Sequence, residues 1–321
     1  MALDKLTLQL EVGQFSHPGR KRQNNEDWLG TFQPEDPDRL AQKGRLYLVA
    51  DGMGGHQSGE MASRCAADQV IRNYLDDSER DIARALRRAV EKANATLYAR
   101  SAETETSRRW GTTLVAAVVR RDELWIANVG DSRAYMLRNG KLRQLSRDHS
   151  LSATELGIEP GSDWIGRHMI TRALGTKPKV EVDVFPPITL RVGDQVLLCS
   201  DGLTTPLSDE EIQGIVEHHS PQEAAETLVR AANDGGGPDN VSVILVRVVG
   251  GSTGPTGQLP GQILANLLRP ETVQDLISEV QSVVSGEKSW RSPVFFAIVL
   301  FVCASLLCLG FALGVLIFGI I

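Results

Sequence analysis

The sequence is short of cysteine, and the few cysteines form no recognisable framework. Its 321 residues include four of them, Cys65, Cys199, Cys303 and Cys308, with no C-x-x-C pair. A network of disulfides is therefore not expected, and a reducing compartment fits better. Neither Cys65 nor Cys199 is followed by arginine six residues later. This absence excludes a cysteine-nucleophile loop of the C-x5-R type.

The chain also lacks the features of several other classes of protein. The formal net charge is -6, so no basic excess is available to bind nucleic acid. No G-x-x-x-x-G-K-[ST] loop occurs, which argues against an NTPase. The histidines show neither H-x-x-x-H nor H-E-x-x-H spacing. The first residues, MALDKLTLQLEVGQ, lack a basic segment followed by a long apolar core, so no secretory signal is expected.

A long apolar run is present at the C-terminal end. Val294 to Ile321 contains no charged side chain and would span roughly 40 Å as a helix. The hydrocarbon layer of a bilayer is about 30 Å thick, so we expect a transmembrane helix rather than a buried core helix. Lys288, Trp290 and Arg291 precede it and favour a cytoplasmic N-terminal side. The sequence thus predicts a C-terminal anchor in the cell membrane, with the remainder of the protein in the cytoplasm.

Two features near this run leave alternatives open. Gly310 and Gly314 form a G-x-x-x-G that would let two helices approach closely, although such spacing is common by chance in membrane helices. A weak dimer is therefore one alternative. Residues 250–262 are rich in Gly, Pro, Ser and Thr and indicate a linker. Apolar residues then recur at helical spacing between Val273 and Val284, which predicts a short amphipathic helix that acts as a spacer or docks on lipid or a partner.

The residues before the linker mix strands and helices. Five apolar runs predict buried strands: Leu46–Ala50, Thr113–Val119, Leu124–Val129, Val196–Cys199 and Val241–Val249. One helix face is expected from the spacing of Ile82, Leu86, Val90, Ala93 and Leu97. Ser208 with Glu211, and Ser220 with Glu223, predict capping boxes at two further helix starts. The pattern indicates an α+β fold over 1–249, a linker region over 250–293 and a membrane helix over 294–321.

Acidic residues fall at the ends of these predicted strands. Asp51 and Asp201 each close an apolar run and are followed by glycine, whereas Asp239 directly precedes a run. Asp131 follows Val129-Gly130, and Glu26 and Asp27 lie near the start of the chain. A carboxylate beside a buried strand is costly unless its charge is compensated, and several together repel one another. Each Asp-Gly alone is a common turn pair, but the combination predicts a site for hard divalent cations, Mg²⁺ or Mn²⁺.

The same motifs, taken in order, resemble those of the type 2C (PPM) metal-dependent Ser/Thr protein phosphatases, in their bacterial form. The resemblance covers about residues 10 to 248. Its motifs are RQNNED (22–27), VADGMGG (49–55), GTT (111–113), ANVGDSRAY (127–135), ITRALG (170–175), LLCSDGL (197–203) and GPDNVSVILV (237–246). The resemblance implies a four-layer αββα sandwich, in which two antiparallel sheets pack together and helices cover the outside.

The resemblance also implies a two-metal site and a role for each matching residue. Asp51 should bridge both metals, and the Gly52 carbonyl should bind one of them. Asp201 and Asp239 should complete the other metal's shell. Asp27 matches a further acidic position of the site, and Glu26 should hold metal-bound water. Arg22 matches the arginine that binds substrate phosphate, and Asn240 is expected to shape the loop beside Asp239.

The sequence departs from the family pattern at two places. Some members carry a histidine at the position of Met53, proposed to protonate the leaving group, whereas the nearest histidine here is His56. The general acid is thus open, and metal-bound water could serve. A third metal of bacterial members uses the aspartate matching Asp131 and a second one whose place is taken here by Thr205. That metal should bind weakly or be absent. Leu151–His168 matches the family's variable flap, which is expected to touch substrate.

The predicted function is hydrolysis of phosphoserine and phosphothreonine in proteins by water that two Mn²⁺ or Mg²⁺ ions activate. Expected partners are phosphorylated proteins near the membrane, including Ser/Thr kinases and their substrates. Two alternatives remain. One is a non-catalytic, membrane-tethered module of the same fold, which the presence of all the core carboxylates disfavours. The other is a two-metal hydrolase of small phosphoesters, which sequence separates poorly because specificity lies in loops.

Overall fold

The computed structural model describes residues 8–54, 57–103, 110–151 and 169–251. Contacts divide the chain into two units, Met1–Gly254 and Pro255–Ile321, and the second lies outside the described residues. Two predicted helices fall in this second unit, the linker helix and the membrane helix with Gly310 and Gly314. Most of the predicted flap, residues 152–168, also lies outside the described residues. Among the described residues, no helix is both long and apolar enough to cross a bilayer. The three domain boundaries stay a prediction.

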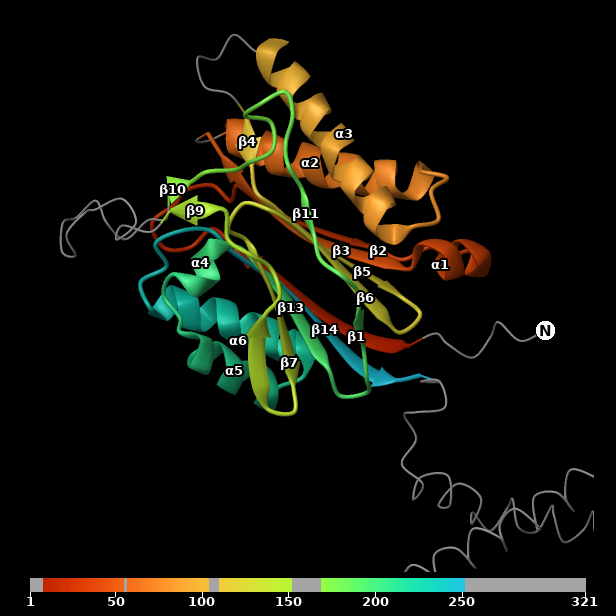
Figure 1. Cartoon of the computed structure of the whole chain (residues 1–321). Helices are drawn as coiled ribbons and strands as arrows, with labels where there is room; N and C mark the ends of the chain where they lie inside the picture. The colour runs from red at the N-terminus through yellow and green to blue at the C-terminus, as the bar shows by residue number, and fades with distance from the viewer. Residues whose placement is uncertain (1–7, 55–56, 104–109, 152–168, 252–321) are drawn as a thin grey trace, which may run out of the picture. The chain divides into compact units, whose positions relative to one another are not determined.

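Two antiparallel sheets form the centre of the described unit (Figure 1). One sheet has the order β1 (Gln9–His17), β14 (Val241–Gly250), β13 (Gln195–Cys199), β7 (Arg133–Arg138) and β8 (Lys141–Gln144). The other has the order β11 (Asp183–Val184), β6 (Glu123–Val129), β5 (Leu114–Arg120), β3 (Arg45–Met53) and β2 (Asp27–Phe32), with β12 (Ile188–Thr189) on β6 and β4 (Gly111–Thr112) on β3. A short ribbon of β9 (Ser150–Leu151) and β10 (Met169–Ile170) stands apart from both sheets.

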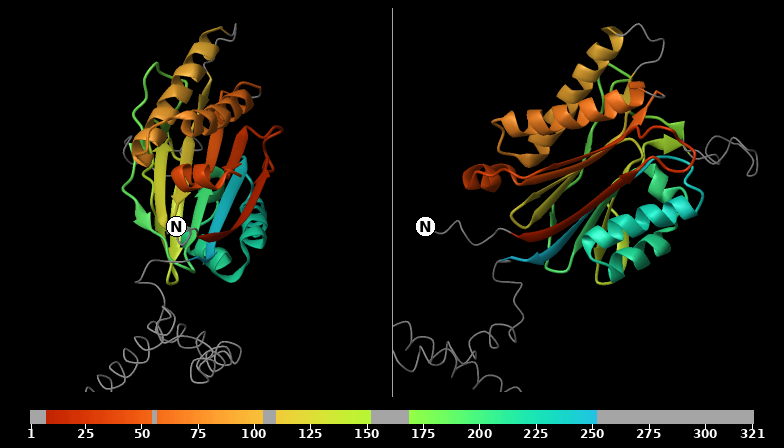
Figure 2. Two further views of the ribbon diagram at one scale, coloured as in Figure 1. Left: turned by 90° about the vertical axis from the view of Figure 1, so that its right-hand side faces the viewer. Right: turned by 180° about the vertical axis from the view of Figure 1, so that it is seen from behind.

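Helices cover the outer face of each sheet (Figure 2). The long helices α2 (Gln57–Asp76) and α3 (Ile82–Glu103) lie on the sheet that contains β3, which we call the α2/α3 sheet. The helices α5 (Asp209–His218) and α6 (Pro221–Asp234) lie on the sheet that contains β14, which we call the α5/α6 sheet. Two short helices complete the unit, α1 (Pro37–Lys43) and α4 (Asp201–Thr204).

The alternation of side chains along the strands produces three apolar layers. On β3, Leu48 packs against the helices, whereas Val49 faces the opposite sheet. On β14, Val243 faces α6 and Ile244 faces the other sheet. Each fully buried Val, Leu or Ile side chain contributes about 1.5–3 kcal/mol. This stack of helix, sheet, sheet and helix confirms the predicted αββα sandwich.

The structure also shows the helix face, the helix caps and the strands that the sequence predicts. The five apolar positions from Ile82 to Leu97 are all buried on α3. The Ser208 hydroxyl accepts the Glu211 N–H, and the Glu211 carboxylate accepts the Ser208 N–H. At α6 the Glu223 carboxylate accepts hydrogen bonds from both the N–H and the hydroxyl of Ser220. The five predicted strands match β3, β5, β6, β13 and β14 to within a few residues. β3 continues through Asp51 to Met53, because β4 pairs with its last residues.

Candidate active site

The layer between the two sheets becomes acidic at one end. Asp27, the first residue of β2, lies directly opposite Asp51 on β3. Both follow the alternation of Leu29 and Val49, which face the opposite sheet. Directly opposed residues of an antiparallel pair have Cβ atoms about 4.5–5.5 Å apart. The register of β2 against β3 therefore places two predicted metal ligands side by side.

The α5/α6 sheet supplies the other side of this acidic end. Ser200, at the end of β13, donates a hydrogen bond from its hydroxyl to Asp27 Oδ2 over 2.8 Å. The Ser242 N–H at the start of β14 donates in turn to Ser200 Oγ over 3.0 Å. Ser200 immediately precedes Asp201, the first residue of α4. These contacts connect the two sheets where the carboxylates gather.

Arg22 and Asp239 contact each other at the outer side of the site. The Arg22 guanidinium donates from Nη2 to Asp239 Oδ2 over 2.7 Å. Arg22 lies between β1 and β2, and Asp239 lies just before β14, so the loops of two elements meet here. Both side chains are partly exposed. The predicted phosphate-binding residue is thus next to a predicted metal ligand, and it forms a charge-assisted hydrogen bond with it.

Glycines allow Glu26 and Gly52 to approach each other. The Gly52 N–H donates to the Glu26 carbonyl over 3.1 Å. A Cβ added to Gly59, in the first turn of α2, would overlap the Glu26 carboxylate and would also lie 3.1 Å from the Gly52 carbonyl oxygen. Two of the predicted oxygen donors therefore lie against one backbone position. Ser63, one turn further along α2, donates to the Glu26 carbonyl over 2.5 Å.

Asn240 fixes the loop that carries Arg22 and Glu26. Its Oδ1 accepts the Glu26 N–H over 2.8 Å. Its Nδ2 donates to the carbonyls of Pro18 and Asn24, each over 2.9 Å. Three of the amide's hydrogen-bonding positions are thus used by the segment between β1 and β2. Asn240 was expected to shape the loop beside Asp239, whereas its side chain holds the segment before β2.

Asp51 and Asp131 are held together by two threonines and a serine. Thr113 Oγ1 accepts the Asp51 N–H over 3.0 Å, and the Thr112 hydroxyl donates to the Asp51 carbonyl over 2.8 Å. The hydroxyls of Thr113 and Ser132 lie 2.6 Å apart. Ser132 follows Asp131 in the GDSR motif. The GTT motif therefore fixes Asp51 and joins it to the loop of Asp131.

The electrostatics of the site favour a bound cation. Burial raises the pKa of Asp27 to about 7, opposed by its serine hydrogen bonds and supported by Asp201 and Asp239. Burial raises the pKa of Asp51 well above its ordinary value, and Asp27, Asp201, Asp239 and Asp131 raise it further. Burial raises the pKa of Asp131 to about 7, with Asp201 the largest charged contribution. Compensating positive charge would lower all three pKa values.

The residues fit a metal site in chemistry, although no formed ligand cage is present. Asp27 Oδ1 and Asp131 Oδ1 are buried and have no hydrogen-bond partner among the described residues. All predicted donors are oxygens, which suits Mg²⁺ or Mn²⁺. No group of three His, Cys, Asp or Glu side chains in the described ranges already has the spacing of a metal centre. Two predicted ligands have protein partners instead, Asp27 with Ser200 and Asp239 with Arg22. The metal roles therefore stay predictions.

Several positioning residues were not identified from the sequence. Ser200 donates to the Asp27 carboxylate, and Ser63 donates to the Glu26 carbonyl. Ser242 and Ser132 act one step further away, through Ser200 and Thr113 respectively. Serine beside a strand gives no distinctive signal, although Ser200 and Ser132 adjoin the predicted aspartates. Met53, at the position of the missing histidine, is half-buried at the end of β3, and His56 lies outside the described residues.

Comparison with known proteins agrees with this geometry. The family profile described as Protein phosphatase 2C matches residues 33–234. The serine/threonine phosphatase stp of Listeria welshimeri is 36% identical over 238 residues, which cover 71% of this chain and 92% of that protein. The chain belongs to the protein phosphatase 2C family.

Further relatives of this 2C-family phosphatase are similar in sequence and in structure. The serine/threonine protein phosphatase PstP of Mycobacterium tuberculosis is 36% identical over 262 residues, covering 78% of this chain and 48% of PstP. The crystal structure of the PstP catalytic domain with two manganese ions has a TM-score of 0.63 at 33% identity, and the match covers 76% of this chain and 100% of that one. PppA of Pseudomonas aeruginosa gives a TM-score of 0.62 at 30% identity, with 76% and 99% covered. Membership and these relatives identify the protein as a Ser/Thr protein phosphatase.

The raised carboxylate pKa values predict how stability depends on pH. Asp27 and Asp131 have pKa values of about 7 in the folded protein, against about 3.9 for an unfolded chain. Between these values the folded state binds more protons, so the free energy of unfolding should fall as pH rises from about 4 to about 7. Urea unfolding of the chelator-treated phosphatase, followed by tryptophan fluorescence, measures this slope. Saturating Mn²⁺ should reduce it.

The matched control is Asp131→Asn, which removes one ionising group and keeps its size. In chelator its free energy of unfolding should fall less between pH 4 and pH 7 than that of the unmodified protein, because one of the three carboxyl groups with a raised pKa can no longer titrate. Equal slopes in the two proteins would show that Asp131 is not a buried, proton-binding carboxyl group.

Proposed function

We propose that this phosphatase hydrolyses phosphoserine and phosphothreonine in proteins with two Mn²⁺ or Mg²⁺ ions held by the acidic end of the sandwich. In this proposal Asp51, the Gly52 carbonyl, Asp201 and Asp239 would hold the two ions. The observation that carries it is the meeting of Asp27 and Asp51 from one sheet with the Ser200-Asp201 turn of the other. The PstP catalytic domain, which is similar to this chain, was solved with two manganese ions, and this supports the proposal of a two-ion site.

Bound cations would supply Lewis acidity and lower the pKa of water. The chain's own residues bind the phosphate and orient the water. Arg22 has five N–H donors, and Asp239 accepts from Nη2. Donors therefore remain to bind two oxygens of a phosphate while the guanidinium stays beside Asp239. Its positive charge stabilises the phosphoryl oxygens most as negative charge spreads in the transition state. The Glu26 carboxylate and the Gly52 carbonyl both lie against Gly59, and there the carboxylate can accept a hydrogen bond from water and orient it.

Asp131 stands in this proposal as the candidate ligand of a third, weaker ion. Its Oδ1 is buried without a hydrogen-bond partner in the described part of the chain, and Asp201 contributes to its raised pKa. The second aspartate of such a site is absent, because Thr205 stands at the C-terminal end of α4. One carboxylate fewer lowers the charge available to a third cation.

Membrane tethering is the second part of the proposal, and it is carried by the uncharged run from Val294 to Ile321. A tether confines the phosphatase and raises its effective concentration toward phosphorylated proteins at the same surface. Membrane-bound Ser/Thr kinases and their substrates are the expected partners. A dimer through Gly310 and Gly314 is a secondary element of this proposal.

Replacing Asp201 with asparagine should abolish turnover while the fold stays intact, because the neutral amide cannot compensate cationic charge. Hydrolysis of a phosphothreonine peptide with Mn²⁺ should fall at least about a hundredfold, the cost of removing one transition-state stabilising group. Asp234→Asn is the matched control, since Asp234 is exposed and paired with Arg20. Full activity in Asp201→Asn would contradict the assignment. A nucleotide assayed in parallel tests whether small phosphoesters are the substrates instead.

Replacing Arg22 with alanine should mainly raise the Michaelis constant for the phosphopeptide. The loss of hydrogen bonds to a charged phosphate predicts a rise of about tenfold or more. The assay uses saturating Mn²⁺, because Arg22 also contacts the predicted ligand Asp239. Arg20→Ala is the control, since its partner is the exposed Asp234. An unchanged Michaelis constant in Arg22→Ala refutes its role as the phosphate-binding residue.

Deleting residues 294–321 should release the phosphatase from membranes, because about 20 apolar residues are what holds a spanning helix in the bilayer. Alkaline extraction of the membrane fraction, followed by immunodetection, measures the release. The double variant Gly310→Leu and Gly314→Leu is the control, which should stay in the membrane fraction and lose any helix-mediated dimer. Full-length protein found entirely in the alkaline extract would refute the tether.

A further inference from the structure

His149 is a buried polar residue that the proposed chemistry does not use, and it has an unusual number of partners. Its N–H donates to the Gly130 carbonyl over 2.9 Å. Its ring Nδ1 accepts the Gly130 N–H over 3.0 Å. His149 thus binds both polar groups of the residue that precedes Asp131. Gly130 has a φ of +105°, a backbone conformation that residues other than glycine rarely adopt.

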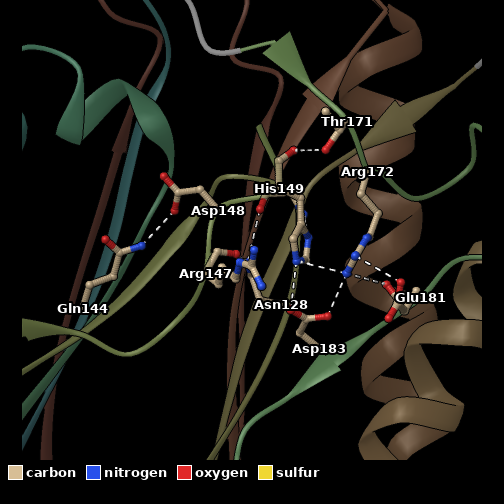
Figure 3. A network of polar contacts seen from close by, with 10 residues as sticks. Asn128, Gln144, Arg147, Asp148, His149, Thr171, Arg172, Glu181 and Asp183 are labelled. Carbon is tan, nitrogen blue, oxygen red and sulfur yellow. Dashed lines mark hydrogen bonds and ion pairs between the residues drawn. The ribbon is translucent and has the colours of Figure 1, made fainter. Parts of the chain in front are cut away.

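The main chain of His149 also holds the ribbon of β9 and β10. The His149 carbonyl accepts the Thr171 N–H over 2.8 Å and the Thr171 hydroxyl over 3.0 Å. Ser150, the next residue, begins β9, which pairs with β10 immediately before Thr171. The two strands lead into and out of residues 152–168, the segment expected from the sequence to touch substrate. Figure 3 shows His149 between Thr171 and Asp183.

The far side of the ring is held by Asp183 of β11. Nε2 lies 3.1 Å from Asp183 Oδ2 and 3.0 Å from Arg172 Nη1. Because Nδ1 accepts from Gly130, a neutral ring carries its proton on Nε2 and donates it to Asp183. Arg172, which can only donate, binds Asp183 Oδ1 over 2.7 Å. The carboxylate therefore orients both the ring and the arginine that follows Thr171.

A parallel contact strengthens the connection between the two segments. Arg133, the last residue of the GDSR motif, makes a two-pronged ion pair with Asp148, with distances of 2.8 to 3.1 Å. The Asn128 side chain donates to the Arg147 carbonyl over 2.7 Å. Residues 147–149 therefore bind residues 128–133 at each step. A shift of one segment would break contacts of the other.

We propose that His149 is a positioning residue of the phosphatase, which holds the Gly130-Asp131 turn and the β9–β10 ribbon in one arrangement. The inference rests on the proposed function, because it matters for turnover only if Asp131 belongs to the catalytic site. The ring acts through two atoms with separate tasks. Nδ1 fixes the Gly130 amide, and Nε2 fixes the ring itself against Asp183.

Three variants of the full-length chain separate these tasks. His149→Ala removes both contacts. His149→Asn places a carboxamide oxygen near the position of Nδ1 and so can still accept the Gly130 N–H. His149→Gln reaches the position of Nε2 and so can donate to Asp183, but it offers nothing to Gly130. Glu181→Ala is the control, because Glu181 is the exposed outer partner of Arg172.

Two measurements are made on each variant. Amide hydrogen exchange is followed by mass spectrometry in peptides that cover residues 128–132 and 169–173, and kcat and KM are measured on a phosphothreonine peptide. His149→Ala should exchange at least about tenfold faster in 128–132, because the Gly130 N–H loses its buried acceptor. It should also exchange faster in 169–173, because loss of the ring contacts frees the His149 main chain, whose carbonyl holds Thr171. Its kcat/KM should fall about tenfold or more. His149→Asn should recover protection of 128–132 and most of kcat, whereas His149→Gln should not.

The control variant and the exchange data test the role of His149 separately from the proposed phosphatase chemistry. Glu181→Ala should match the unmodified protein in both measurements. The positioning role is overturned if His149→Asn and His149→Gln behave alike, or if His149→Ala changes exchange in only one of the two peptides. Exchange requires no turnover, so failure of the proposed phosphatase chemistry would appear as inactivity of every variant and of the unmodified protein. If His149→Ala does not fold, the Asn and Gln pair decides the question.

Discussion

The site depends on several carboxylates held close together beside an apolar layer. Such an arrangement is unfavourable by itself, because burial and mutual repulsion both oppose ionisation. The raised pKa values of Asp27, Asp51 and Asp131 express this cost. The sandwich can maintain it because the two sheets are fixed by extensive apolar contacts below the acidic end. The stability of the core is what allows a locally unfavourable cluster to persist as a site for cations.

The geometry of the cluster follows from strand register more than from any single loop. Asp27 stands opposite Asp51 because β2 and β3 pair continuously from Phe32 with Leu46 up to that point. A slip of one residue would send the Asp27 side chain to the helix-covered face. From the other sheet, Ser200 and Ser242 follow the same inward alternation as Leu198 and Ile244. The two serine hydroxyls therefore occupy the next inward-facing positions after the aliphatic side chains. The interface between the sheets changes from apolar to polar within two residues of each strand.

The sequence predicted the fold, and the structure brings Asp27, Asp51 and the Ser200-Asp201 turn together. Apolar runs of strand length and helix caps are local signals, and Ser208 with Glu211 formed the predicted box. The strand-end aspartates were visible because carboxylates are rare beside buried strands. The register, the pairing of Arg22 with Asp239 over 217 positions and the role of Asn240 in the first loop are contacts distant in sequence. The periodicity of residues within one segment cannot predict such contacts. The role of His149 could not be predicted either, because its partners come from three separate segments.

The contacts of the GDSR turn explain how Asp131, a candidate metal ligand, can be held without a helix or strand around it. Asp131 lies between Gly130, which His149 binds from one side, and Ser132, whose hydroxyl meets Thr113 on the other. Thr113 in turn accepts the N–H of Asp51. A continuous chain of hydrogen bonds thus runs from Asp183 through His149 and the GDSR turn to the central aspartate. Because each donor or acceptor in it is buried or half-buried, breaking one link leaves a polar group unsatisfied. The β9–β10 ribbon and the acidic cluster therefore share one rigid support, although their residues lie far apart in the sequence.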